Sequence, residues 1–143
     1  MKGIEKMAQK ITTSVNSLVA KANAQVTTIS VKDALELFDK DDHVFIDVRD
    51  IREINRSGKI PGAFSCPRGM LEFWIDPASP YHKEVFNQDK TYVFYCAAGW
   101  RSALSAQTAK DMGLGPVCHI DGGFSEWSAS ENPVEKQESR LKP

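Results

Sequence analysis

The sequence contains no long apolar run and almost no excess of charge. No stretch approaches the roughly 20 consecutive apolar residues that a transmembrane helix requires, so we expect no membrane-spanning segment. The formal net charge of the 143 residues is −1. Such a balance gives no overall attraction to nucleic acid or to an anionic membrane surface. We therefore expect neither nucleic acid nor a membrane among the partners of this protein.

Cysteine and histidine are both scarce. The three cysteines are an odd number, which argues against a disulfide framework, and the three histidines are scattered at His43, His82 and His119. Because no C-x-x-C or H-x-x-x-H pair occurs, we expect no metal site. The N-terminus has lysines but no continuous apolar segment typical of secretion signals. These absences together predict reduced thiols in a cytoplasmic protein.

Strand-like and helix-like segments alternate along the chain. The apolar, β-prone runs predict strands at 26–29, 43–48, 63–66, 91–95 and 116–120. Helical turns are predicted at 30–38, 69–75, 81–87 and 102–112, and residues 121–127 are predicted to form a Gly-led turn into a short helix. This alternation predicts an α/β domain with a mainly parallel sheet. Reactive groups in such folds lie at the carboxyl ends of strands.

Residues 1–25 precede this domain and have a helical pattern of their own. Apolar residues recur three and four positions apart, at Ile4, Met7, Ile11, Val15, Leu18 and Ala22. Two interpretations stay open: a helix docked on the domain's own surface, or a pairing helix that forms a homodimer or binds a partner. The domain proper covers residues 26–127. The polar tail at 128–143 is expected to be frayed or loosely docked.

The most informative feature is the end of the fourth predicted strand, where Cys96 is followed by the small residues Ala97, Ala98 and Gly99. Arg101 closes this loop at the start of a helix. Unpaired N–H groups at a helix start attract anions, and small side chains let them approach the sulfur. Because the thiolate is the reactive form of cysteine, this pattern predicts that Cys96 is a nucleophile.

Four motifs, in order, resemble those of the single-domain rhodanese-like sulfurtransferases. They are Ile46–Asp50 (D-[VT]-R-[DE]), Glu53 with Gly58–Ala63 (E…G-H-I-P-G-A), Cys96–Ser102 (C-x-x-G-x-R-[ST]) and Asp121–Trp127 ([LD]-x-G-G-[FW]-x-x-W). One departure is Lys59, where histidine is usual. The resemblance covers residues 26–127, and the N-terminal helical extension is not part of the family's basic domain.

The resemblance implies a rhodanese-like α/β fold with a five-stranded parallel sheet flanked by helices. It implies that the Cys96 thiolate takes a sulfane sulfur from a donor such as thiosulfate and becomes a persulfide. The outer sulfur then passes to cyanide or to a thiol, including a protein thiol, without a cofactor. In a supporting role, Arg49 would pair with Glu53 to pin the loop after the second strand, and Asp47 would lie near the active-site loop.

The other residues of the loop receive expected roles as well. Arg101 is expected to bind the anionic donor, because a guanidinium suits the oxygens of thiosulfate. Trp100 could form a pocket wall, mark a protein-docking surface or pack against Phe124 or Trp74. Ser102 is expected to cap the following helix rather than to act in catalysis.

The remaining thiols and histidines are expected to be bystanders. Cys66 and Cys118 fall in predicted strands and are expected in the core, where Cys118 shares a face with Ile120. No histidine has a sequence position that suggests a general base. The expected scheme needs none, because the loop itself stabilises the thiolate.

Two other functions compete with sulfur transfer. Cysteine phosphatases on the same fold also use a cysteine-to-arginine loop, but their spacing is C-x5-R, whereas Cys96 and Arg101 are separated by four residues. The tighter loop suits a single sulfur atom better than a phosphate. Tyr95 also precedes the cysteine, where those phosphatases have histidine. The second competitor is a persulfide-relay or protein-interaction module, with Trp100 and the N-terminal helix as partner surfaces.

Overall fold

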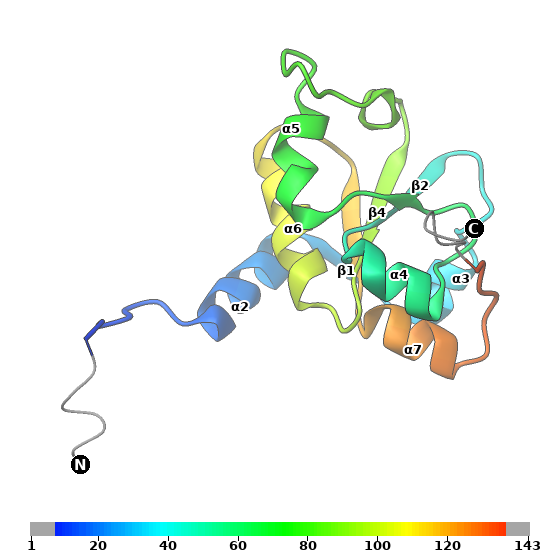
Figure 1. Ribbon diagram of the computed structural model, residues 1–143, viewed down its shortest axis with the longest axis horizontal. Helices are drawn as coiled ribbons and strands as arrows, with labels where there is room; N and C mark the ends of the chain where they lie inside the picture. The colour runs from blue at the N-terminus through cyan, green and yellow to red at the C-terminus, as the bar shows by residue number, and fades with distance from the viewer. Residues whose placement is uncertain (1–7, 137–143) are drawn as a thin grey trace.

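The computed structural model describes residues 8–136, which form an α/β domain around a five-stranded sheet (Figure 1). Each strand pair is parallel, and the strand order is β1-β5-β4-β2-β3. The strands are β1 (Thr27–Ile29), β2 (His43–Asp47), β3 (Phe64–Ser65), β4 (Thr91–Tyr95) and β5 (Val117–Ile120). This architecture confirms the expected fold class. Since β4 lies at the centre, the segment that follows it is flanked by the ends of β2 and β5.

Helices connect the strands on both faces of the sheet. The α-helices are α2 (Val15–Gln25), α3 (Val31–Leu35), α4 (Ile51–Ser57), α5 (Leu71–Ile75), α6 (Trp100–Asp111) and α7 (Gly123–Ala129). Two 3₁₀ turns are η1 (Arg68–Met70) and η2 (Glu84–Phe86). Within residues 8–136, every helix is too short or too polar to cross a bilayer.

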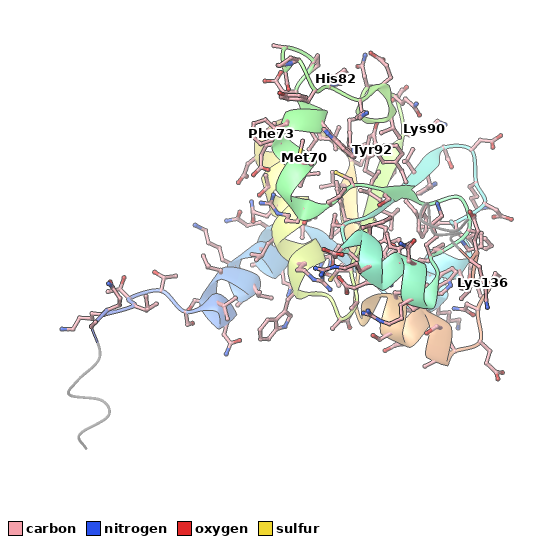
Figure 2. All side chains as sticks on the ribbon, viewed as in Figure 1. Met70, Phe73, His82, Lys90, Tyr92 and Lys136 are labelled. Atoms are coloured by element: carbon pink, nitrogen blue, oxygen red, sulfur yellow. The ribbon has the colours of Figure 1, made fainter. Side chains whose placement is uncertain are left out.

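The alternation of side chains along β4 divides the core into two layers. Tyr92, Phe94 and Cys96 pack on one face, together with apolar residues of α5 and α6. Val93 and Tyr95 pack on the other face, against α3 and α7. Tyr92, labelled in Figure 2, is fully buried, and its hydroxyl donates to the carbonyl of Val85 at 2.7 Å. Burial on both faces explains why the β4 sequence is almost continuously apolar.

The N-terminal extension is helical over a shorter range than expected. Helix α2 begins only at Val15, because the Ser14 side chain caps it, and residues 8–14 are not helical. Positions 4 and 7 of the expected stripe lie outside the described residues. Val19 and Ala22 are buried against Ala103 of α6, whereas Ile11 is 78% exposed. The helix is therefore docked on the domain, and pairing with a second chain stays a prediction.

Two other segments differ from the expectation. Residues 51–57 form helix α4 instead of a loop, because Asp50 and Glu53 make a reciprocal capping box at its start. The tail is also better ordered than expected up to residue 136. Lys59 and Glu135 exchange backbone hydrogen bonds of 2.9 and 2.8 Å, and the Trp127 indole N–H donates to the carbonyl of Pro133. These contacts fasten the extended tail against the turn after α4.

Candidate active site

Cys96 lies one residue beyond β4, where the strand's backbone ladder ends and a tight loop leads into α6. Its Sγ accepts hydrogen bonds from the backbone N–H groups of Gly99 at 3.1 Å and Ser102 at 3.3 Å. Gly99 adopts φ +119°, a conformation that L side chains rarely take. This backbone turn brings the N–H groups of the N-cap residue Gly99 and of Ser102, the third residue of α6, onto the sulfur. The site can therefore hold a thiolate by direct hydrogen bonding.

Helix α7 holds the loop from the other side. Phe124 N–H donates to the Cys96 carbonyl at 2.8 Å, and Ser125 N–H donates to the Ala97 carbonyl at 3.0 Å. A Cβ added to Gly123 would lie 2.7 Å from the Ala97 oxygen and would also meet the Cys96 oxygen. The second glycine of the Asp121–Trp127 motif is therefore needed because the two backbones are in direct contact.

Arg101 is paired with Glu53, so the expected pair between Arg49 and Glu53 is wrong. Two guanidinium nitrogens of Arg101 contact the two Glu53 carboxylate oxygens at 2.8 and 3.0 Å. The hydrogen bond from Arg101 lowers the pKa of Glu53 to about 2. The Arg101 side chain remains 42% exposed. Helix α4, which the sequence analysis missed, places Glu53 beside the active-site loop.

Arg49 pairs instead with Asp47, and both are buried. The Arg49 guanidinium contacts an Asp47 carboxylate oxygen at 2.7 Å and donates to the Gly58 carbonyl at 2.7 Å. Its carbon Cζ lies 4.2 Å from the ring centroid of Phe124 in α7. The pair thus links the end of β2 to the helix that holds the loop. A supporting role for Asp47 and Arg49 stays a prediction.

Ser102 does not cap α6, contrary to expectation. Gly99 occupies the N-cap position, and Ser102 is the third residue of the helix. The Ser102 hydroxyl lies 3.5 Å from Cys96 Sγ and 3.0 Å from Nδ1 of His119, which is only 2% exposed. Sequence reasoning assigned His119 no role. The alternation along β5 was the available signal, because Cys118 and Ile120 face α3 and α7, which turns His119 toward α6.

Of the remaining residues considered in the sequence analysis, Trp100 lies at the surface and the other two cysteines lie in the core. Trp100 is 53% exposed, and no aromatic pair within residues 8–136 includes it. Ala97 and Ala98 line the loop, but the N–H groups that contact Sγ belong to Gly99 and Ser102. Cys66 and Cys118 are buried as expected. Burial raises the pKa of the Cys66 thiol to about 12 and that of Cys118 to about 11.

The fold and the loop define a class: an α/β domain that holds a cysteine at the carboxyl edge of its sheet, on a turn whose backbone N–H groups donate to the sulfur. The family model of the rhodanese-like domain matches residues 30–130. The chain therefore belongs to the rhodanese-like domain family.

Two curated proteins and one solved structure are similar to this chain. The mouse thiosulfate sulfurtransferase/rhodanese-like domain-containing protein 3 is 34% identical over 116 residues, covering 78% of this chain and 74% of that protein. The thiosulfate sulfurtransferase GlpE of Pseudoalteromonas translucida is 30% identical over 102 residues, covering 71% and 89%. A solved structure from Rhodopseudomonas palustris is 54% identical with a TM-score of 0.88, covering 90% of this chain and 99% of that chain. It is described as a protein of unknown function and possible tyrosine phosphatase.

Proposed function

We propose that this protein is a sulfurtransferase that carries sulfane sulfur on Cys96 as a persulfide. The observation that carries the proposal is the pair of backbone N–H groups, from Gly99 and Ser102, that converge on the buried Sγ. Donors in this position stabilise a sulfur anion both before and after a sulfur atom is added. The names of the mouse and Pseudoalteromonas relatives support thiosulfate as the donor.

The reaction divides into two balanced steps. In the first, the Cys96 thiolate attacks the outer sulfur of thiosulfate, a new S–S bond forms, and sulfite leaves with the electron pair of the bond that breaks. In the second, cyanide or a thiolate attacks the outer sulfur of the persulfide. Thiocyanate or a new persulfide leaves, and the Cys96 thiolate is restored. Each step transfers one neutral sulfur atom, which gives ping-pong kinetics with a covalent intermediate.

The surroundings of the loop favour an anionic donor. Within residues 8–136, the backbone N–H groups of Trp100 and Arg101 at the start of α6 have no protein acceptor, and such groups bind anions. The Arg101 guanidinium uses two nitrogens on Glu53. A guanidinium has five N–H donors, so donors remain for the oxygens of thiosulfate. Glu53 thereby fixes the guanidinium at the mouth of the loop.

The acceptor would approach past Trp100. This residue is the first of α6, and its ring is half-exposed beside the loop that bears the nucleophile. An exposed tryptophan is a common anchor in protein interfaces. We therefore include a protein thiol among the acceptors, next to cyanide and small thiols.

A cysteine phosphatase is the second candidate, favoured by the description of the 54% identical structure. Two features count against it. The loop has four residues between Cys96 and Arg101 instead of five, and two backbone N–H groups converge on the single Sγ atom. This geometry leaves less room for three phosphate oxygens than for a single sulfur.

A paired assay decides between the two. Purified protein and its Cys96→Ser variant are given thiosulfate with cyanide, and separately p-nitrophenyl phosphate. We expect thiocyanate from the wild type, none above background from the variant, and negligible phosphate release from both. If the wild type releases phosphate at least as efficiently as it forms thiocyanate, the sulfurtransferase assignment is wrong.

A further inference from the structure

A line of hydrogen bonds leads from the nucleophile to a buried histidine. Cys96 Sγ lies 3.5 Å from the Ser102 hydroxyl, which lies 3.0 Å from Nδ1 of His119. Within residues 8–136, Ser102 is the only residue whose side chain makes a hydrogen bond to this sulfur. The Cys96 residue is 1% exposed, and the Ser102 hydroxyl is the side-chain group that can accept its proton.

The N-terminal helix determines which nitrogen of the ring carries the proton. The Asn23 side-chain oxygen Oδ1, on α2, lies 2.7 Å from His119 Nε2. An amide oxygen only accepts hydrogen bonds, so Nε2 carries the hydrogen and Nδ1 of the neutral ring is an acceptor. Docking of α2 through Val19 and Ala22 on α6 holds Asn23 over the ring. The extension thus contributes a residue to the surroundings of the active site.

This tautomer orients the Ser102 hydroxyl. Its O–H donates to Nδ1, and a lone pair of Oγ is left to accept the S–H of Cys96. The competing acceptor, the carbonyl of Gly99, is more distant at 3.3 Å. The neutral network is therefore arranged in one direction, from thiol to hydroxyl to imidazole to amide.

We propose that Ser102 and His119 form a proton relay that deprotonates Cys96, with Asn23 holding the imidazole in its accepting tautomer. The S–H bond breaks and its proton moves to Ser102 Oγ, while the hydroxyl's own proton moves to Nδ1. No atom is oxidised or reduced. The products are a thiolate that accepts a hydrogen bond from Ser102, and an imidazolium that donates through both nitrogens. The relay serves the proposed sulfur transfer and rests on it for its purpose.

The electrostatic surroundings of His119 determine how readily its ring accepts the proton from Cys96. Burial lowers the pKa of His119, and the charge of Asp121 opposes that effect. The thiolate formed in the same step further stabilises the imidazolium, so the two groups titrate as a pair. Among the residues that the structure describes, three side chains lie within hydrogen-bond distance of the ring, and all are uncharged. They are Asn23 of α2, Thr28 of β1 and Ser102 of α6.

The test measures thiolate formation in the full chain without any sulfur donor. Ultraviolet absorbance of the thiolate is followed against pH. Burial raises the pKa values of Cys66 and Cys118 to about 12 and about 11, and tyrosine ionises only near about pH 10. The signal below about pH 9 therefore reports Cys96. The variant His119→Asn keeps an acceptor for the Ser102 hydroxyl but cannot hold a proton. We expect its thiolate midpoint to rise by about one pH unit or more.

Kinetics separate a relay from a merely structural role. Persulfide formation from thiosulfate should fall about tenfold near neutral pH in His119→Asn, the factor that matches a midpoint shift of about one unit. It should return to the wild-type rate at high pH, where the thiol ionises without help. An equal loss at every pH would overturn the relay, and so would an unmoved midpoint in a variant that melts like the wild type.

A second variant tests the relay by changing Asn23, the exposed residue that contacts His119 Nε2. Asn23→Asp places a carboxylate on Nε2–H, which stabilises the imidazolium and should shift the thiolate midpoint downward. Asn16→Asp adds the same charge elsewhere on α2 and should not. If Asn23→Asp shows no shift beyond that control, the relay is wrong even where His119→Asn fails to fold. A wild type that forms the thiolate as expected but no persulfide would overturn the sulfurtransferase proposal alone.

Discussion

The three cysteines are buried to nearly the same degree, yet their surroundings differ. Cys66, Cys96 and Cys118 each expose 6% or less of their surface, and all three are free. Desolvation raises the pKa of Cys66 to about 12 and that of Cys118 to about 11, so both stay protonated and inert. Cys96 Sγ accepts two backbone N–H hydrogen bonds. Burial alone therefore does not decide whether a thiol in this protein is reactive.

The difference follows from the backbone N–H groups that each sulfur can reach. Cys66 also comes one residue after its strand, β3, but Pro67 follows it and has no N–H to donate. Cys118 is within β5, where strand pairing with β1 and β4 uses the backbone N–H groups. Cys96 comes one residue after β4, where the ladder has ended and α6 has not yet begun its own hydrogen bonds. Such a junction leaves N–H groups free. What sets Cys96 apart is a strand end that leads directly into the start of a helix.

The largest expected effect is the complete loss of persulfide in Cys96→Ser. After incubation with thiosulfate, peptide mass spectrometry should find one added sulfur atom on the Cys96 peptide and none on the peptides with Cys66 or Cys118. Cys118→Ala is the matched control. It should lose about 1 kcal/mol of stability from the small cavity and keep its persulfide. Added sulfur on Cys66 or Cys118 would contradict the distinction between the three thiols.

Gly123→Ala should have the next largest effect, because it displaces the loop without replacing the cysteine. The new methyl group would overlap the Ala97 carbonyl oxygen at 2.7 Å, and φ at this residue is +54°. The backbone strain alone should cost roughly 1–3 kcal/mol. Displacement of the loop should lower kcat/KM by about a hundredfold or more, as misplacement of reacting groups does.

Gly62→Ala is the control for this prediction. Gly62 also has a positive φ, of +80°, but an added Cβ there meets nothing within 4 Å. It should therefore lose stability, measured by urea unfolding, and keep kcat/KM. Equal activity losses in the two variants would show that contact between α7 and the loop does not matter.

Much of the structure of this site was predictable because it is local in sequence. The strand, the small-residue turn and the helix around Cys96 follow one another, so composition and order were enough to predict where the structure places its sulfur. The five strands were predicted for the same reason, since each is a short apolar run bounded by turn residues. The spacing of Asp50 and Glu53 fits a capping box and therefore indicates the start of α4. The sequence analysis instead assigned Glu53 to an ion pair with Arg49.

The missed features depend on contacts between distant segments. Arg101 and Glu53 are 48 residues apart, and Asn23 and His119 are 96 apart. Which side chains meet at such separations is decided by the strand order, which puts β2 and β5 on either side of β4. Arg49 and Glu53 are close in sequence, but the burial of Arg49 beside Asp47 directs its guanidinium away from Glu53. Local pattern could not distinguish these partners.

The smallest expected effect concerns the charge at the mouth of the loop. The Arg101 hydrogen bonds lower the pKa of Glu53 from an ordinary 4.5 to about 2, so the folded state favours the carboxylate. The resulting stability is present above about pH 4.5 and is lost as the pH falls toward about 2. Glu53→Gln should cost on the order of 1 kcal/mol at neutral pH, since half-exposed pairs are screened by solvent. The difference from wild type in urea unfolding should shrink steadily below about pH 4.5.

The control for Glu53 is Glu72→Gln, which removes the Arg68–Glu72 pair, 2.9 Å apart on the surface around α5. That variant should change stability by a few tenths of a kcal/mol and leave kcat/KM for thiosulfate unchanged. Glu53→Gln should in addition raise the KM for thiosulfate by several fold, because the Arg101 guanidinium is no longer fixed at the loop. If the KM of Glu53→Gln equals that of wild type, the Arg101–Glu53 pair stabilises the fold without positioning the anion-binding group. The difference in reactivity between Cys96 and the other two thiols would then depend on the backbone N–H groups of Gly99 and Ser102 and on the buried side chains of Ser102 and His119.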